Sequence, residues 1–364
     1  MNKKKIIGFS VSLGVLVLLL VGAIIAFFVI EPYKSKKRVQ YSPDYLKYSE
    51  TYNLHFDKKA NEYYIIGLKD IKKSSLKIPE KIDNIPVTKI IDEENSFSDY
   101  QFISEIVISK YIKYIGVFTG NDIKPYRQPF LQATGVSRFT VDPDNQYFTS
   151  IDGVLYTKDE KTLLRYPNAK DFGLGYIEFV IPDQVEYIDE YSFYLCDSLE
   201  SIKFGKNIKK VGYMAFYNCI NLQNVELNDG LISLGKDSFY DCENLSAITL
   251  PKSLSIVEDG CFTNCKKLRE ITILSEDPTL IGAFSGITSQ KVNSETQQGE
   301  VSNIYFYIPV ENTNMIDNFQ DLNYVKNIGI NGLSGQYAKA FIFLNNVKGI
   351  IEGEKIVYDN KIAK

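Results

Sequence analysis

Apolar residues recur at a fixed interval through the middle of the chain. The pattern Phe-x-x-Cys-x-x-Leu occurs four times between Phe193 and Leu268, and each copy starts 23 residues after the last. This interval is typical of a solenoid, in which each repeat is one coil that buries its apolar face against its neighbours. Stretches such as Ile202-Lys203-Phe204 alternate apolar and polar residues, which predicts a short strand. A turn or short helix should complete each coil.

Equal positions in successive coils are expected to form ladders, because neighbouring strands lie about 4.8 Å apart. Less regular coils upstream fit the same template of buried positions. In the coil before the first copy these positions are Tyr176, Phe179, Ile181, Val185 and Ile188. Further upstream they are Ile103, Ile106, Ile108, Ile112 and Ile115. The sequence therefore predicts a β-rich solenoid whose coils begin well before Phe193.

The repeat resembles the BspA-type leucine-rich repeats of bacterial and some protist surface proteins. Besides the Phe-Cys-Leu pattern, the likeness rests on Ile-Pro pairs at Ile78-Pro79 and Ile308-Pro309 and on the stretch from Val141 to Pro167. In that family a similar stretch inserts a hairpin between coils. The resemblance covers roughly residues 60–310. It implies a solenoid on a cell surface that binds other molecules, and it names no ligand.

The predicted organisation has five parts. They are a short cytoplasmic tail at 1–5, a transmembrane signal-anchor helix at 6–30, a juxtamembrane stalk at 31–60, the leucine-rich-repeat solenoid at 61–310 and a C-terminal cap at 311–364. The solenoid should carry a hairpin insertion near 145–167 and a polar loop near 287–303. At its start, Tyr63–Gly67 is predicted to pair with Leu76–Ile78. Alternating residues at 340–344 and 355–358 predict strands in the cap.

Residues Ile6–Ile30 contain no charged side chain. At about 1.5 Å per residue a helix of this length reaches roughly 37 Å, enough to cross a hydrocarbon core of about 30 Å. A cleaved signal peptide is the alternative, but its apolar part would be shorter and followed by small residues. An uncleaved anchor is favoured. Lysines precede the span and Lys34–Arg38 is basic too, so charge does not decide its orientation. The family resemblance favours an extracellular solenoid.

Charge is unevenly distributed along the chain. The formal net charge is −4, yet residues 1–38 hold seven basic side chains against one acidic, which leaves 34 basic against 44 acidic residues elsewhere. An acidic solenoid argues against a nucleic-acid partner, whose phosphates require a basic face. The same acidity also serves simple solubility.

Candidate chemistry is sparse. The four aligned cysteines (Cys196, Cys219, Cys242 and Cys265) are open to three interpretations: a metal or redox stack, disulfides between rungs, or small buried side chains, which we favour. The single histidine, His55, precedes the solenoid, so no histidine-based triad or zinc site is expected within the repeats. Oxygen ligands at Asp142, Asp144, Asn145 and Asp152 fit a turn better than a calcium loop. No catalytic residue, cofactor or metal is predicted.

The side of each strand that faces away from the core is the candidate binding surface. Its predicted partner-binding residues are Glu178, Ser201, Lys203, Asn224, Glu226, Thr249, Glu270 and Thr272. The hairpin tip around Lys158–Lys161 and the loop at 287–303 are alternative binding patches. The favoured function is a membrane-anchored adhesion or interaction module that binds an extracellular protein or glycan. The alternatives are a structural envelope scaffold that associates with other membrane proteins, and an enzyme that uses carboxylates on the solenoid.

Overall fold

The computed structural model describes residues 42–69, 74–92, 102–119, 122–125, 130–131, 133–170, 173–275, 283, 305–307, 341–344, 347–352 and 355–358. The predicted tail, transmembrane segment and polar loop near 287–303 lie outside these ranges. Within them, no helix combines the length and apolar character needed to cross a membrane. One helix is described, α3 (Pro43–Ser49), and the Ser42 hydroxyl caps it by accepting a bond from the Tyr45 amide at 2.9 Å.

The first sheet is mixed and begins with an antiparallel hairpin of β1 (Tyr52–Asp57) and β2 (Glu62–Leu68). β2 then pairs in parallel with β5 (Ile85–Asp92), and β5 pairs in parallel with β7 (Tyr114–Thr119). β4 (Lys81–Ile82) and β8 (Asp122–Pro125) add antiparallel partners to β5 and β7. Residues 52–57, which the sequence placed in a stalk, thus form a strand of this sheet.

The predicted pairing of Tyr63–Gly67 with Leu76–Ile78 is wrong. β2 instead pairs with β1 and β5, while β3 (Ser75–Lys77) pairs with β6 (Glu105–Ile108) in another sheet. The reason is local, because the turn before β2 closes the hairpin with β1. The Asp57 carboxylate accepts two backbone amides there, and Asn61 adopts a left-handed φ of 55°.

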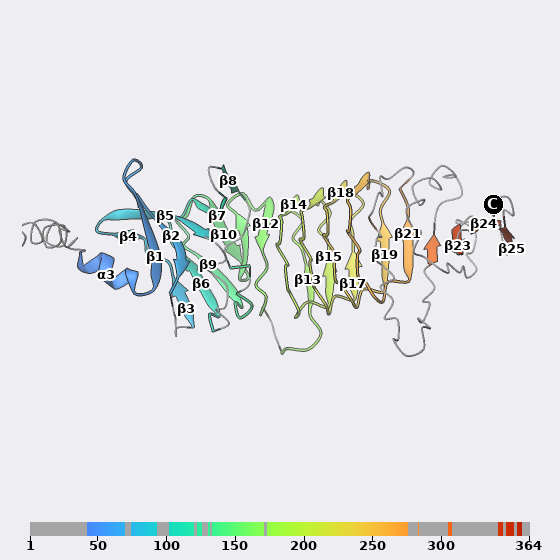
Figure 1. Cartoon of the computed structure of the whole chain (residues 1–364), viewed down its shortest axis with the longest axis horizontal. Helices are drawn as coiled ribbons and strands as arrows, with labels where there is room; N and C mark the ends of the chain where they lie inside the picture. The colour runs from blue at the N-terminus through green and yellow to red at the C-terminus, as the bar shows by residue number, and fades with distance from the viewer. Residues whose placement is uncertain are drawn as a thin grey trace, which may run out of the picture. The chain divides into compact units, whose positions relative to one another are not determined.

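One parallel ladder follows the predicted strands (Figure 1). It consists of three sheets, whose strands are β3, β6 and β9 (Arg138–Val141); β13 (Glu178–Val180), β15 (Ser201–Lys203) and β17 (Asn224–Glu226); and β19 (Ala247–Leu250), β21 (Glu270–Ile273) and β22 (Tyr305–Tyr307). From β13 to β17 and from β19 to β21, paired residues lie 23 positions apart, as in Glu178, Ser201 and Asn224. The predicted leucine-rich-repeat solenoid is confirmed for these coils.

A second parallel ladder was not predicted. It joins β12 (Thr162–Arg165) to four two-residue strands, β14 (Tyr187–Ile188), β16 (Lys210–Val211), β18 (Ser233–Leu234) and β20 (Ile256–Val257). Ahead of it, β10 (Phe148–Ile151), β11 (Val154–Thr157) and β12 form an antiparallel meander in the region of the predicted hairpin insertion. The last strand of the meander therefore starts the second ladder of the coils.

Turns, and no helix, complete each coil within residues 173–275. Two residues of every turn have a left-handed backbone, two positions before and two positions after the phenylalanine. Tyr191 and Leu195 do so in one coil and Asp237 and Asp241 in another, with φ between 54° and 60°. This conformation costs roughly 1–2 kcal/mol for most residue types. The turn is therefore maintained by the packing around it.

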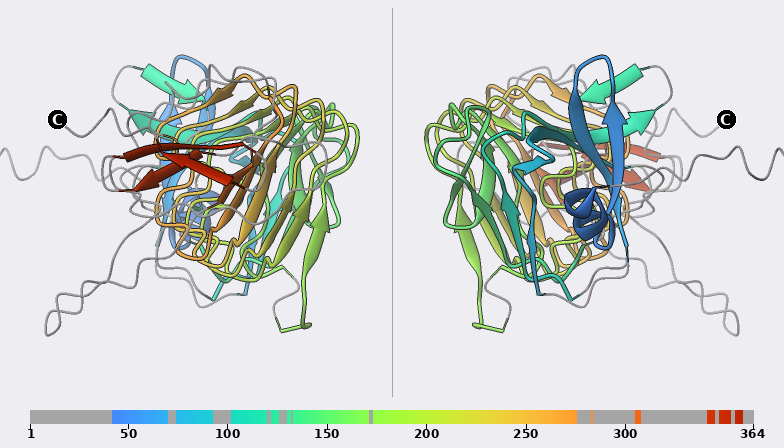
Figure 2. Two further views of the ribbon diagram at one scale, coloured as in Figure 1. Left: turned by 90° about the vertical axis from the view of Figure 1, so that its right-hand side faces the viewer. Right: turned by 90° about the vertical axis from the view of Figure 1, so that its left-hand side faces the viewer.

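The core is a set of stacked ladders, as predicted. Ring centroids of Phe193, Phe216, Phe239 and Phe262 follow one another at 4.6, 4.8 and 5.6 Å, with interplanar angles of 14° or less. One predicted core residue is misplaced, because Tyr176 is 59% exposed and Ile177 is buried in its stead. Left-handed glycines at Gly173 and Gly175 carry this segment outward before β13, and Figure 2 shows the yellow-green loop projecting from the coils.

All five cysteines are free and fully buried. The Cys219, Cys242 and Cys265 thiols each lie 3.0–3.2 Å from the carbonyl oxygen of the phenylalanine one coil earlier. Burial raises the pKa of the Cys196 thiol to about 12 and that of Cys219 well above its usual value. The thiols therefore keep the proton with which they donate across the coil interface.

We expect no cysteine of the folded chain to react with a thiol reagent at pH 8, because the thiols are neither exposed nor ionised. In denaturant without reductant, all five should react at once. With a reagent that releases a chromophore on reaction, absorbance measures the number of reactive thiols in the folded and in the unfolded chain. A disulfide between rungs would leave fewer than five reactive thiols in denaturant. A reactive metal or redox stack would give thiols that react with the reagent in the folded chain.

The carboxyl-terminal strands β23 (Phe341–Leu344), β24 (Val347–Glu352) and β25 (Lys355–Tyr358) form one antiparallel sheet. Two of these strands coincide with the stretches that the sequence predicted. That this sheet caps the solenoid remains a prediction.

Candidate partner-binding groove

A groove of about 600 Å³ lies over the first ladder, across β13, β15, β17 and β19. Six of the eight predicted partner-binding residues line it: Glu178, Ser201, Lys203, Asn224, Glu226 and Thr249. Glu270 and Thr272 are on β21, outside the groove lining. The equal spacing of the coils explains this gathering, because residues 23 positions apart become neighbours on adjacent strands.

Most of these side chains face solvent as predicted, but Ser201 is only 6% exposed. Nearby, the Tyr176 hydroxyl accepts a hydrogen bond from the Asn224 side-chain amide at 3.1 Å. Because β15 lies between β13 and β17, the phenol of Tyr176 reaches across the strand that carries Ser201. Sequence reasoning assigned Tyr176 to the core. Its preceding Gly-Leu-Gly triplet was the signal that the chain leaves the coil there.

Charge within the groove is predominantly negative. Lys203 and Glu226 form an ion pair at 2.5 Å between neighbouring strands. Glu178 and Asp229 are exposed, and neither carboxylate has a hydrogen bond or ion pair with another described residue. Beside them, Leu227, Pro251 and Leu274 contribute an apolar part of the lining. The arrangement offers two uncompensated carboxylates next to an apolar surface.

Residues 175–289 match the sequence model of the family described as BspA type leucine rich repeat region, in six copies. This segment is a BspA-type leucine-rich repeat region. Every residue that lines the groove lies within it, from Tyr176 to Leu274. No curated protein matches the chain.

Several solved structures are similar to the chain that carries this BspA-type region. A leucine rich cell surface protein from Faecalibacterium prausnitzii A2-165 is 18% identical, with a TM-score of 0.41 over 66% of this chain and 91% of that one. The leucine-rich repeat protein of T. pallidum is 18% identical, with a TM-score of 0.34 over 67% and 90%. The pneumococcal vaccine antigen PcpA is 14% identical, with a TM-score of 0.39 over 75% and 96%. With TM-scores below 0.5, these similarities add no support to any function.

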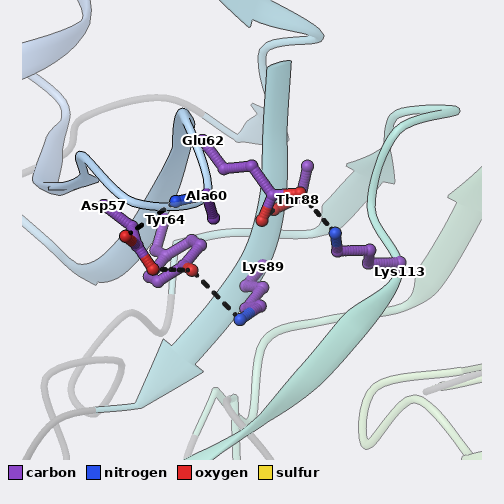
Figure 3. Close-up of polar contacts among 7 residues, drawn as sticks. All are labelled: Asp57, Ala60, Glu62, Tyr64, Thr88, Lys89 and Lys113. Carbon is purple, nitrogen blue, oxygen red and sulfur yellow. Dashed lines mark hydrogen bonds and ion pairs between the residues drawn. The ribbon is translucent and has the colours of Figure 1, made fainter. Parts of the chain in front are cut away.

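A second polar cluster lies outside the BspA-type region, on the first sheet (Figure 3). The Tyr64 hydroxyl donates to Asp57 at 2.7 Å, and the Lys89 ammonium lies 4.3 Å from the centre of the Tyr64 ring. Next to them, Glu62 accepts from the Thr88 hydroxyl and pairs with Lys113. Hydrogen bonding to Tyr64 lowers the pKa of the Asp57 carboxyl. Each charge has a counter-charge or donor, so the cluster joins strands and leaves no binding group free.

The single histidine stacks on this cluster, with 5.6 Å between the ring centres of His55 and Tyr64. It thus belongs to strand β1 of the first sheet. Sequence reasoning missed the cluster because its members come from three strands, β1, β2 and β5, and from Lys113 just before β7.

The oxygen-rich stretch near Asp142 behaves as a turn. Asn145 is fully buried, and its side-chain amide donates to the carbonyls of Ser109 and Ile112 at 2.9 Å while its oxygen accepts two backbone amides. Asp152 pairs with Lys170 at 2.8 Å. Among the described residues, no three His, Cys, Asp or Glu side chains gather as a metal site. The bonds from the backbone amides of Tyr147 and Phe148 to the Asn145 side chain support the interpretation of this stretch as a turn.

Proposed function

We propose that this chain is a membrane-anchored cell-surface protein that binds an external protein or glycan through the strand-face groove of its BspA-type region, without catalysis. The observation that carries the proposal is the groove itself, where an exposed, chemically mixed surface lies on a regular backbone. Repeat proteins use such extended surfaces for binding. The uncharged stretch Ile6–Ile30 supports the anchor, and the repeat family supports an external location.

Reversing the charges of the Lys203–Glu226 ion pair tests whether the groove recognises its partner by charge. We expect Lys203→Glu and Glu226→Lys each to weaken binding of the full chain to its partner by about three- to tenfold, because each puts like charges on neighbouring strands. The double swap should restore the ion pair but not the binding, since the charges then stand in exchanged places. Binding to immobilised panels of proteins and glycans, in neutral detergent, provides the measurement.

The pair Lys161 and Glu186, 2.6 Å apart and outside the groove, gives the matched control. Its double swap should leave binding unchanged. Full binding by the Lys203→Glu and Glu226→Lys double swap would mean that the pair serves the fold alone.

Protease treatment of intact cells tests the location. The repeat region should be degraded without lysis, while a cytoplasmic marker protein stays intact. A repeat region protected until lysis would contradict both the external location and adhesion.

A further inference from the structure

We propose that the groove takes an extended polypeptide segment carrying lysine or arginine side chains. This rests on the proposed function, since it names the chemistry of the partner at the same surface. Glu178 and Asp229 carry the inference because they are exposed carboxylates in the groove lining without a cation among the described residues. The one lysine of the lining, Lys203, is already paired with Glu226.

Electrostatics favour a cationic occupant. With Lys203 neutralised by Glu226, the groove keeps two negative charges in a concave surface, where the potentials of neighbouring charges add. A basic side chain gains a counter-charge at each carboxylate. An acidic ligand would meet like charge, and a neutral glycan would gain nothing from either group.

Dimensions fit an extended peptide. β13 and β17 are two rungs apart, roughly 10 Å at about 4.8 Å per rung. Glu178 is in register with Asn224, and Asp229 lies five residues beyond Asn224, so the two carboxylates are also offset along the strands. In an extended segment, side chains on one side repeat at roughly 7 Å, so cations two such repeats apart come within reach of Glu178 on β13 and of Asp229, which follows β17. Long lysine and arginine side chains cover the remaining difference. Apolar residues of the peptide would contact Leu227 and Pro251.

Short labelled probes test this with the full chain in neutral detergent. The probes are an acetylated peptide that alternates lysine with leucine, a matched glutamate–leucine peptide and a neutral oligosaccharide, each followed by fluorescence anisotropy. We expect the lysine peptide to bind, and binding to weaken as salt is raised. The double variant Glu178→Gln with Asp229→Asn should weaken it about tenfold. The reversal Glu178→Lys with Asp229→Lys should favour the glutamate peptide instead.

The control removes two carboxylates elsewhere, with Glu50→Gln and Asp144→Asn, both exposed and outside the groove lining. Equal loss in this control would show that net charge alone attracts the peptide, which overturns the inference. A second result would also overturn the inference: the oligosaccharide binds, and a groove variant such as Thr249→Trp blocks that binding. The proposed function would then still stand. If no probe and no panel member binds the natural chain or the Thr249→Trp variant, the result contradicts both the inference and the proposed function.

Discussion

Replacing Arg165 by methionine should lower the free energy of unfolding by about 3 kcal/mol. Arg165 is 2% exposed, and its guanidinium donates to the backbone carbonyls of Leu131, Tyr191 and Tyr194 and to the side-chain oxygen of Asn168. Methionine fills a similar volume but donates nothing. The variant would leave buried acceptors without these donors.

The position of Arg165 explains why a buried cation stands there. Between successive regular turns, a backbone amide of one turn donates to a carbonyl of the next, as the Leu195 amide does to the Tyr217 carbonyl. At the first regular turn the equivalent carbonyl is that of Tyr194, 23 positions before Tyr217, and it accepts hydrogen bonds from the side chains of Asn168 and Arg165 instead. These two side chains thus take the role of a preceding turn. They join the meander to the repeats.

Urea unfolding of the full chain measures this effect. Arg138 is exposed and provides the control, since Arg138→Met should change stability by less than about 0.5 kcal/mol. Arg165→Lys should fall between, because an ammonium keeps the charge and reaches fewer carbonyls than the forked guanidinium. Equal stability of Arg165→Met and Arg138→Met would contradict the role given to Arg165.

Replacing Asp189 by asparagine should stabilise the chain at pH 8 by about 2 kcal/mol and have little effect at pH 4. Burial raises the pKa of the Asp189 carboxyl to about 7, and one of its oxygens has no hydrogen-bond partner. From about pH 4 to pH 7 the unfolded chain releases this proton while the folded chain retains it. Folding stability therefore falls as the pH rises through this window, and asparagine removes the loss.

Unfolding experiments from pH 4 to pH 8 test this sign. The difference in the free energy of unfolding between Asp189→Asn and the natural chain should increase above about pH 4 and become constant above about pH 7. Asp144→Asn, an exposed carboxylate exchanged in the same way, should show no such window. A stabilisation that is greatest at pH 4 would mean that Asp189 is ionised and favourable in the folded chain.

The first ladder and the aromatic stack could be predicted from sequence because the coils repeat at one interval. Phe216 and Cys219 had only to be placed 23 residues from their counterparts. The second ladder could not, since a strand of two residues such as Lys210–Val211 leaves no alternating pattern. Arg165 looked like an ordinary strand residue. Its role depends on a turn some 26 residues later in the chain.

The groove shows the same limit. Period-two alternation correctly indicated which side of β15 and β17 faces away from the core. It gave no sign that Tyr176 would reach across β15 to Asn224, because that contact depends on the path of a glycine-containing loop. Residues that recur at the 23-residue interval predict the structure of their own coil. Residues outside that pattern, such as Tyr176, make contacts that only the folded structure reveals.

The stacked phenylalanines also restrict how the length of this protein can change in evolution. Because successive coils present matching surfaces to each other, loss or duplication of 23 residues rejoins both ladders in register. An insertion of one residue within a strand would exchange its buried and exposed sides. The chain can thus lengthen or shorten by whole coils, and each added coil would bring one more rung of freely variable surface residues.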